Sequence, residues 1–455
     1  MTAQDVRAAA VARSASSLRA PVVAAVVLGV ALVAVAAVAV PWSVLGRGAP
    51  AVQPSPSTDF SAAQLQRDAA FHAALRAWTY PRLALGIGLA LVLGLSPWGG
   101  RLVFRVGRLL GGSWPAQVLG GTVVLTAIPV LAGVPLGIGA ERVLRRYGLS
   151  TQGWGGWAVD VARAWAVAAV VTALLLLVLV ALARRWPQRW WLPAAALAAA
   201  VTVAGSALYP VLIEPLANDF TPMAAGPQRT ALLDLAIRDG VPVRDVLVAD
   251  ASRRTTTENA YVSGLGATRR IVVYDTLLRS ASPREVELVV AHELGHAKAH
   301  DVRLGTTLGA LAAALAAVLL FLVLEGRRWW RQLLDAEPSG SGIAGPARAA
   351  AANPRAIALI LALATIGGYL AAPASTLVSR RTEARADLHA LNLTRDPEGF
   401  AGMQRRLATS NISDLQPRWY RTLLFATHPA PPWRIAMARA WAQEHGLPGP
   451  TRVAR

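Results

Sequence analysis

The sequence predicts a mainly α, polytopic membrane protein with about seven transmembrane helices and a small α+β domain. Three observations support this prediction. The 455-residue chain is 54% hydrophobic and has a mean hydropathy of +0.42, which is too apolar for an ordinary soluble protein. Seven stretches are long and apolar enough, or nearly so, to cross a bilayer. Two further segments, 217–303 and 379–455, are much more highly charged than the rest of the chain.

The apolar stretches are judged by length, because a membrane span needs about 20 mostly apolar residues. The first stretch is longer than the apolar core of a cleaved signal peptide, so we expect it to be retained as an anchor. Trp42, Trp78 and Trp114 lie near stretch ends, as in the aromatic belts of membrane proteins. The expected spans are residues 21–44, 79–96, 115–139, 164–184, 190–213, 304–324 and 355–378.

These spans divide the chain into regions. Two spans separate the loop after the fifth span from the C-terminal tail, so both segments lie on the same side of the membrane. We therefore expect them to fold together as one catalytic domain. The regions are 1–216 with five transmembrane helices, 217–303 as the catalytic loop, 304–378 with spans six and seven, and 379–455 as the C-terminal part of the domain. A flexible linker is expected at 326–354, around the Pro- and Gly-containing segment Glu337–Pro346.

Short periodic patterns within the loop predict its elements. Thr230–Arg238 has the spacing of an amphipathic helix. The segments Val243–Ala249, Asn259–Ser263 and Ile271–Tyr274 have the composition of short strands, and Gly264 lies at a turn between the last two. The loop is therefore expected to be an α+β unit.

Charge and cysteine content exclude several classes of function. The net charge of +19 comes almost wholly from arginine, since Lys298 is the only lysine. The arginines flank apolar segments and form no single basic block, so we expect no nucleic-acid partner. The chain has no cysteine, which excludes disulfides and thiolate metal sites. Any zinc must therefore be held by histidine and carboxylate side chains.

The motif His292-Glu293-Leu294-Gly295-His296 is the most informative feature of the loop. On a helix, positions i and i+4 lie on one face, so two imidazoles can bind one Zn²⁺. Glu293, between them, can act as a general base on a water molecule. The sequence Ser282-Pro283-Arg284-Glu285 predicts a capped helix start in water, two turns before the motif.

A catalytic zinc ion needs a third protein ligand, and three candidates follow the motif. His300 continues the same helical face, but ligands on one straight helix would span about 12 Å from His292 and cannot converge. Asp301 has the same difficulty. Glu383 lies just after the last span, on a helix that can cross the first, and Asp387 is placed to orient a histidine ligand. Spacing alone leaves Glu383 undecided between a ligand and a solvated charge.

The order of motifs resembles the integral-membrane zinc metalloprotease family that contains the type I CAAX prenyl protease. In that family the His-Glu-x-x-His motif is followed, after two spans, by a Ser-Arg-x-x-Glu segment ending in Ala-Asp. Ser379, Arg380, Glu383 and Asp387 match this segment. The family's Asn-Ala-Tyr segment matches Asn259, Ala260 and Tyr261, and its last motifs match Asn411–Asp414 and Thr427-His428-Pro429, with Arg434 beyond them.

The resemblance implies roles for these residues. Glu383 becomes the third ligand of a single zinc ion per chain, and Asp387 holds a histidine ligand. Asn259, Ala260 and Tyr261 resemble an edge strand on which substrate peptide is laid. His428 is expected to stabilise the oxyanion. Arg434 is expected near the substrate, although Trp433 replaces a glutamate that often precedes it in the family.

The expected function is therefore a membrane-embedded zinc endopeptidase that cleaves membrane-associated or unfolded polypeptides. Alternatives are a heat-shock-type quality-control protease of membrane proteins and a catalytically dead membrane sensor or scaffold. The expected partners are a peptide or protein substrate and the lipid bilayer. We expect a multi-pass protein of a bacterial cell membrane. Arginine is denser on the N-terminal side, which favours an external catalytic domain, whereas the resemblance favours a cytoplasmic one. Long domains escape the charge rule, and we expect the cytoplasmic face.

Overall fold

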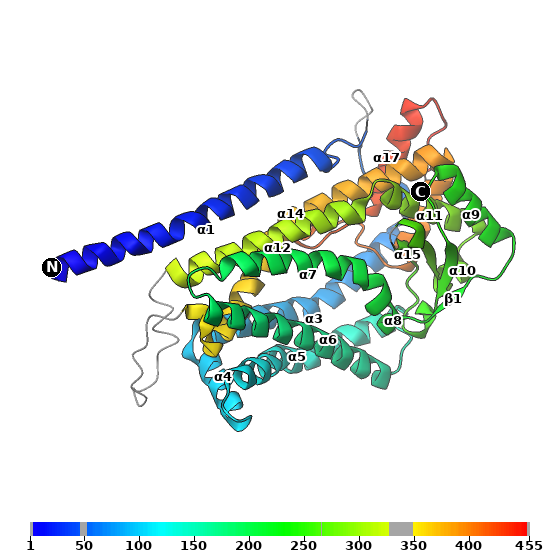
Figure 1. The fold of residues 1–455 in the computed structure, drawn as a ribbon. Helices are drawn as coiled ribbons and strands as arrows, with labels where there is room; N and C mark the ends of the chain where they lie inside the picture. Colours follow the sequence, from blue (N-terminus) through cyan, green and yellow to red (C-terminus); the bar gives the residue numbers. More distant parts are fainter. Residues whose placement is uncertain (1–2, 46–51, 265, 327–348, 453–455) are drawn as a thin grey trace.

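Long helices lying side by side make up most of the molecule, and a small sheet with shorter helices lies at one end of them (Figure 1). The computed structural model describes residues 3–45, 52–264, 266–326 and 349–452. The predicted fold class, mainly α with a small α+β portion, is confirmed. The predicted flexible segment Glu337–Pro346 lies outside the described residues.

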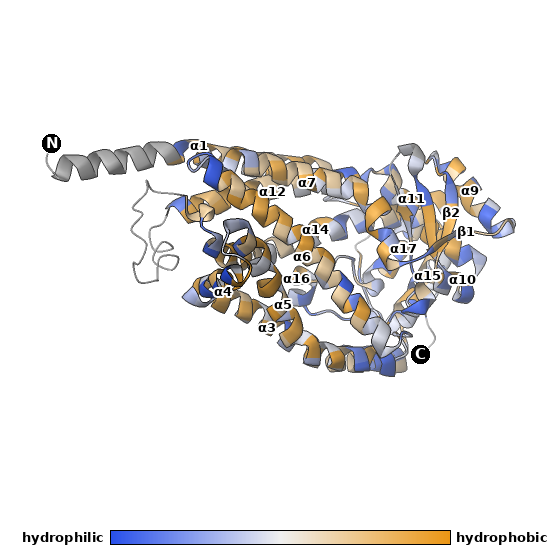
Figure 2. Cartoon of the chain, turned by 60° about the horizontal axis from the view of Figure 1, so that its bottom comes forward, coloured by the Kyte–Doolittle hydropathy of each residue, from blue (hydrophilic) through white to orange (hydrophobic). Residues whose placement is uncertain are grey.

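The seven expected spans are confirmed as seven helices of the described chain that are long and apolar enough to cross a membrane. Apolar residues run along these helices, and polar residues gather toward the end that holds the sheet (Figure 2). The helices are α1 (Ala3–Ala39), α3 (Ala62–Leu95), α5 (Trp114–Arg146), α6 (Trp154–Arg185), α7 (Trp191–Leu212), α12 (Asp301–Gly326) and α14 (Ile357–Thr394).

Several of these helices extend well beyond the predicted spans, and α3 and α14 do so on the side of the polar domain. Helix α3 begins at Ala62, where Ser61 and Gln64 form a capping box, and its first turns are more polar than the apolar part that follows. Helix α14 continues through the predicted end of the last span at residue 378 and ends only at Thr394. The segment after residue 378 is rich in alanine, arginine and leucine, which favour helix, and contains no proline or glycine. A single helix therefore joins the membrane region to the polar domain.

The shorter elements connect the spans or belong to the polar domain. They are α2 (Pro56–Asp59), α4 (Pro97–Leu109), α8 (Glu214–Ala217), α9 (Pro227–Asp239), α10 (Asp275–Ser280), α11 (Pro283–Lys298), α15 (Pro397–Ser410), α16 (Trp419–Leu424), α17 (Pro431–Glu444) and 3₁₀ turns at Ala251–Arg253, Gly266–Thr268, Ala350–Ala352 and Pro354–Ala356. The amphipathic helix expected at Thr230–Arg238 is present as α9.

The sheet of the described residues has four strands in the order β1-β2-β4-β3. Its central pair, β2 and β4, is parallel, and both outer pairings are antiparallel. The sequence indicated three of these strands. It gave no signal for β1, which has only three residues and ends in proline. The strands are β1 (Phe220–Pro222), β2 (Asp245–Ala249), β3 (Ala260–Ser263) and β4 (Arg270–Tyr274).

One apolar core joins the catalytic loop to the C-terminal tail. Leu288 and Leu294 of α11 and Ile271 of β4 are fully buried in the same cluster as Phe400 and Trp441 of the tail. The two segments therefore fold as one unit, although two spans separate them in sequence. The division of the whole chain into four regions, with boundaries at residues 216, 303 and 378, stays a prediction.

Candidate active site

Helix α11 carries the two motif histidines and begins with a capping box. The Ser282 side chain accepts a hydrogen bond from the Glu285 backbone, the Glu285 carboxylate accepts one from the Ser282 backbone, and Pro283 occupies the first turn. Such a cap contributes about 1 kcal/mol to helix stability. Three turns later His292 is buried, and one turn beyond it His296 is half-buried on the same face.

Close packing of α11 against α14 depends on Gly295, the glycine within the motif. A Cβ atom at this position would lie 3.0 Å from the His389 Cβ and 3.2 Å from the Ala386 Cα. Both neighbours belong to α14, and the second is backbone, which cannot move aside cheaply. The glycine therefore lets the two helices approach until Glu383 of α14 reaches the histidines.

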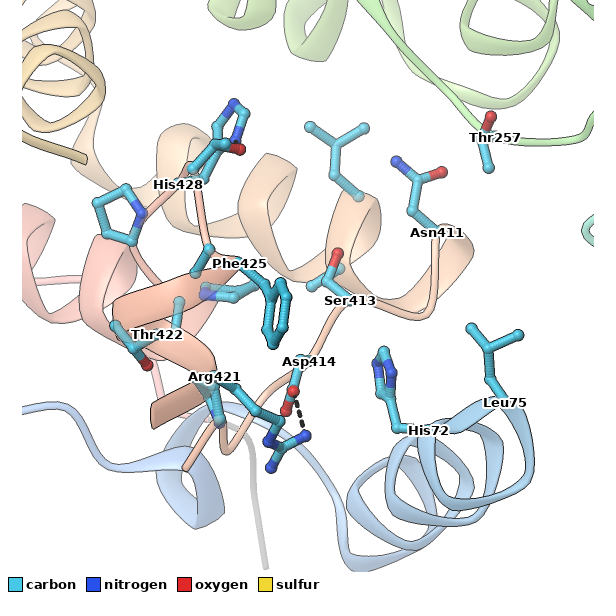
Figure 3. A pocket seen from close by; sticks show the side chains of 18 of the residues that line it. His72, Leu75, Thr257, Asn411, Ser413, Asp414, Arg421, Thr422, Phe425 and His428 are labelled. Carbon is cyan, nitrogen blue, oxygen red and sulfur yellow. Dashed lines mark hydrogen bonds and ion pairs between the residues drawn. The ribbon is translucent and has the colours of Figure 1, made fainter. Parts of the chain in front are cut away.

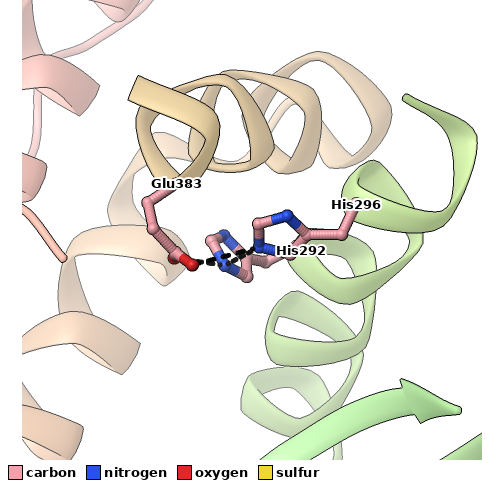
Figure 4. Close-up of side chains that lie close together, drawn as sticks. All are labelled: His292, His296 and Glu383. Carbon is pink, nitrogen blue, oxygen red and sulfur yellow. Dashed lines mark hydrogen bonds and ion pairs between the residues drawn. The ribbon is translucent and has the colours of Figure 1, made fainter. Parts of the chain in front are cut away.

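His292, His296 and Glu383 converge on one point between the two helices (Figure 4). The two Nε2 atoms lie 3.2 Å apart. The Glu383 Oε2 lies 3.2 Å from the His292 Nε2, and the Oε1 lies 3.5 Å from the His296 Nε2. Bond lengths of about 2.0–2.1 Å to a tetrahedral zinc ion imply ligand separations of about 3.3 Å. The three spacings thus match one zinc coordination sphere.

The contacts behind the histidines also fit a metal. The His292 Nδ1 lies 2.9 Å from the Asp387 Oδ1, and the His296 Nδ1 lies 2.8 Å from the Asp301 Oδ2. Nδ1–H donation to these carboxylates leaves the Nε2 lone pair of each ring facing the centre. The Glu383 Oε2 is buried there without a hydrogen-bond partner. A divalent cation satisfies all three groups, so the residues present fit zinc.

The three candidates for the third ligand lie in different places. Glu383 groups with the histidines, whereas His300 is exposed, has a left-handed backbone with φ of 56°, and lies outside the cluster. Helix α11 ends at Lys298, so His300 does not lie on a straight continuation of the motif helix.

The Asp301 side chain lies behind His296 and not at the point where the three side chains converge. Asp301 begins α12, accepts from His296, and forms an ion pair with Arg385 of α14. The only sequence signal for this contact was an acidic residue just beyond the end of the motif helix. The left-handed backbone at His300 turns Asp301 back toward His296.

Glu293 and Asp387 occupy different electrostatic environments in the same site. Withdrawal from water raises the pKa of Glu293, although His292 and His296 partly oppose this effect, and a raised pKa makes the carboxylate a better proton acceptor. Asp387 is fully buried and is bound by Arg434 of α17, whose Nε lies 2.7 Å from the Asp387 Oδ2. Arg434 thus stabilises the carboxylate that orients His292.

His428 reaches the site from the loop between α16 and α17. Its Nε2 lies 3.2 Å from the Glu383 Oε2. The loop is held by α14: the Arg380 Nη1 donates to the Ala426 carbonyl at 2.7 Å, and the Thr376 hydroxyl donates to the Leu423 carbonyl at 2.6 Å. The sequence indicated Arg380 as part of a motif but gave it no role. In the structure it fixes the segment before His428.

A cavity of about 950 Å³ opens beside this site (Figure 3). His428 and Arg434 line it at the active-site end, and Asn259 lines it beside the sheet. Its other walls come from α3, α15 and α16, including Tyr80 and Phe425. The cavity is large enough for several residues of an extended peptide.

Strand β3 is a free edge of the sheet next to this cavity. Its partner on one side is β4, and Tyr274 donates to the carbonyl of Asn259, so Asn259 and Tyr274 form a hydrogen-bonded pair. Because such pairs alternate along an antiparallel ladder, Ala260 and Val262 turn their backbone groups away from β4. The Asn259 side chain accepts from the Ala260 N–H at 2.9 Å. An extended chain can pair with this edge.

Comparisons with known proteins cover the membrane region and the polar domain alike. Residues 227–442 match the description "Peptidase family M48", and residues 84–219 match "CAAX prenyl protease N-terminal, five membrane helices". The uncharacterized metalloprotease YhfN of Bacillus subtilis is 30% identical over 324 residues, which are 71% of this chain and 73% of that protein. A CAAX prenyl protease 1 homolog of Oryza sativa is 34% identical over 226 residues and 49% of each chain.

One solved structure shows the fold independently of close sequence similarity. The crystal structure of S. mikatae Ste24p superposes with a TM-score of 0.73 at 20% sequence identity. The match covers 93% of this chain and 97% of that chain, so the arrangement of the membrane helices and the polar domain is shared.

Proposed function

The chain belongs to peptidase family M48 and is a membrane-embedded zinc endopeptidase, and from this premise we propose which residues carry out its reaction. His292, His296 and Glu383 hold one zinc ion at the active site. Asp387 and Asp301 orient the two histidines. The observation that supports the proposal best is the convergence of one ligand atom from each residue, each within 4.8 Å of the others, with the Glu383 Oε2 buried and without a hydrogen-bond partner.

The side chains around this point can perform peptide hydrolysis. Zinc, when bound, supplies a Lewis acid that polarises a carbonyl and makes water acidic near neutral pH. Glu293 takes the proton from the attacking water and passes it to the nitrogen of the leaving amine. His428 donates a hydrogen bond to the carbonyl oxygen as it gains negative charge. Arg434 keeps Asp387 ionised. It also lines the cavity, and we propose that it contacts the substrate there.

We propose that the substrates are membrane-associated or unfolded polypeptides. The site lies at the end of the membrane helices, and its cavity accepts an extended chain rather than a folded domain. The purified protein should cleave unstructured peptides in detergent, lose this activity with 1,10-phenanthroline, and regain it when zinc is added. Cleavage that persists after complete zinc removal would refute the proposal.

Asn259, Ala260 and Tyr261 begin the edge on which substrate pairs. Val262→Pro removes an outward N–H while leaving the ladder to β4 intact, because that N–H does not point toward β4. Loss of one hydrogen bond of about 0.5–1.5 kcal/mol should lower kcat/KM by about two- to tenfold. Val262→Ala, which keeps the N–H, is the matched control. Equal kcat/KM in both variants would show that substrate does not pair here.

The alternatives rank lower on specific observations. A catalytically dead scaffold has no need of an intact ligand set with both histidines oriented by carboxylates. A heat-shock-type quality-control role would use the same chemistry on misfolded membrane proteins. The five-helix N-terminal region and the Ste24p-like fold favour the first proposal.

We place the catalytic domain on the cytoplasmic side of a bacterial cell membrane. The chain has no cysteine, so single cysteines can report topology directly. Ile237 of α9 is 74% exposed in the catalytic domain, and Leu109, at the end of α4, is 86% exposed beyond the opposite end of the spans. A membrane-impermeant maleimide should label Leu109→Cys in intact cells and Ile237→Cys only after permeabilisation. The reverse pattern would place the domain outside.

A further inference from the structure

A second cluster of metal-ligating groups lies away from the active site, where α3 meets the segment after α15. Asp68 and His72, one turn apart on α3, face Asp414, and one ligand atom from each lies within 4.8 Å of the others. The His72 Nε2 lies 3.1 Å from the Asp68 Oδ1 and 3.1 Å from the Ile412 carbonyl oxygen. The His72–Asp68 separation resembles the 3.2 Å between the His292 Nε2 and the Glu383 Oε2 in the active site.

The Asp68 carboxylate is buried beside His72. Asp68 is 7% exposed, and its Oδ1 is buried without a hydrogen-bond partner, as is the Glu383 Oε2 in the active site. Its other oxygen, Oδ2, accepts from the Leu415 backbone N–H at 3.3 Å, which fixes the carboxylate with Oδ1 toward His72. The Asp68 Oδ1 and the His72 Nε2 face each other at 3.1 Å, a separation that two ligands of one tetrahedral cation also have.

Asp414 is oriented in a similar way. Arg421 of α16 binds the Asp414 Oδ2 and also donates to the Gln416 carbonyl at 3.2 Å. Arginine therefore fixes the Asp414 carboxylate from outside, as Arg434 fixes Asp387 and Arg385 contacts Asp301 around the active site. In Figure 3, His72 and Asp414 both line the large cavity, and the Asp414–Arg421 pair is marked.

The backbone at Ile412 supplies a fourth donor. Ile412 is buried, yet its φ is +46°, a left-handed conformation that β-branched residues rarely adopt. This conformation turns its carbonyl toward His72. Strain of this kind persists where surrounding structure requires it and gathers at functional sites. The motif Asn411–Asp414 has no part in the peptidase chemistry, so the proposed catalytic function does not account for it.

We propose that Asp68, His72, Asp414 and the Ile412 carbonyl form a second site for a divalent cation, and that zinc occupies it. One imidazole nitrogen with three oxygen donors is a mixed set that suits a tetrahedral zinc ion better than calcium or magnesium, which prefer oxygen ligands alone. The chain would then bind two zinc ions, this one and the one expected at the catalytic motif.

The position of this ion gives it a structural role in the substrate cavity. It fastens membrane helix α3 to a segment that is tied to the sheet, because the Asn411 side chain accepts from the Glu258 N–H at 2.9 Å and donates to the Glu258 carbonyl at 3.1 Å. Glu258 lies directly before Asn259 and the free edge strand. On the other side, Asp414 is bound by Arg421 of α16, the helix that precedes the loop with His428.

Zinc counting by mass spectrometry tests this proposal separately from the catalytic one. Purified protein in detergent is stripped of metal, loaded with a small excess of zinc, and freed of unbound ions. We expect two zinc ions in the parent, one in His72→Gln, one in the near-isosteric Asp68→Asn, and one in His292→Ala. His300→Gln, which alters an exposed histidine outside both clusters, should keep two.

Each stoichiometry has a distinct meaning. Zinc absent from His292→Ala, or two ions retained by His72→Gln, would overturn the second site. If the catalytic assignment alone were wrong, His292→Ala would match the parent, whereas His72→Gln would still lose one ion. Size-exclusion profiles check that the variants fold. The ion that remains in His292→Ala tests the proposal even if the α3 variants do not fold.

Discussion

Replacing Glu293 with glutamine should lower kcat by roughly 10³-fold or more, equivalent to about 4 kcal/mol of transition-state stabilisation. Glutamine has nearly the same shape, but it cannot accept the proton from water at neutral pH. Both histidines and Glu383 remain, so the active-site zinc should stay bound. The measurement is the rate of peptide cleavage beside zinc content for the parent and Glu293→Gln.

The matched control is Glu287→Gln on the same helix. Glu287 lies more than one turn before His292 and pairs with Arg284 at the surface, away from the metal ligands. Its loss should leave kcat unchanged, because surface ion pairs contribute little to stability. If Glu293→Gln kept parental activity while Glu287→Gln did the same, Glu293 would not be the base. Loss of zinc from Glu293→Gln would instead show that the residue supports the metal.

Replacing Glu383 with alanine should release the active-site zinc and abolish cleavage. Two histidines on adjacent turns cannot complete the coordination that a catalytic zinc ion needs. Loss of an outer partner of a ligand costs about 10–100-fold in metal affinity, so loss of Glu383 itself should cost more. Asp387→Asn provides the graded comparison, because it keeps the ligand and weakens only the contact to His292. Zinc affinity by competition with a chelator measures both.

The order of these two effects is the critical result. We expect weaker zinc binding in Glu383→Ala than in Asp387→Asn, and near-parental binding in Glu398→Ala, a control at the exposed start of α15. Equal affinity in Glu383→Ala and the parent would remove Glu383 from the coordination sphere. Asp301 or another carboxylate would then have to supply the third ligand.

The sequence was most informative where local chemistry decides the structure. The capping box before α11 and the apolar length of the spans depend on neighbouring residues only, and both predictions are confirmed. The i, i+4 spacing likewise placed His292 and His296 on one helical face. Such features need no knowledge of how distant segments pack.

The sequence was least informative where two distant segments meet. Spacing alone could not decide on Glu383, because its role depends on how closely α14 crosses α11 at Gly295. A straight helix would carry Asp301 away from the histidines, whereas the left-handed turn at His300 brings it back to His296. Arg380 acts through backbone carbonyls more than 40 residues away, at Thr422 and Ala426. Contacts of this kind leave no periodic pattern in the sequence.

X-ray diffraction from crystals of the zinc-loaded protein, recorded on both sides of the zinc absorption edge, would locate the metal directly. We expect an anomalous peak about 2.0–2.2 Å from the Nε2 atoms of His292 and His296 and from a carboxylate oxygen of Glu383. Protein that cleaves peptides in a zinc-dependent way yet shows no peak at this position would contradict this expectation.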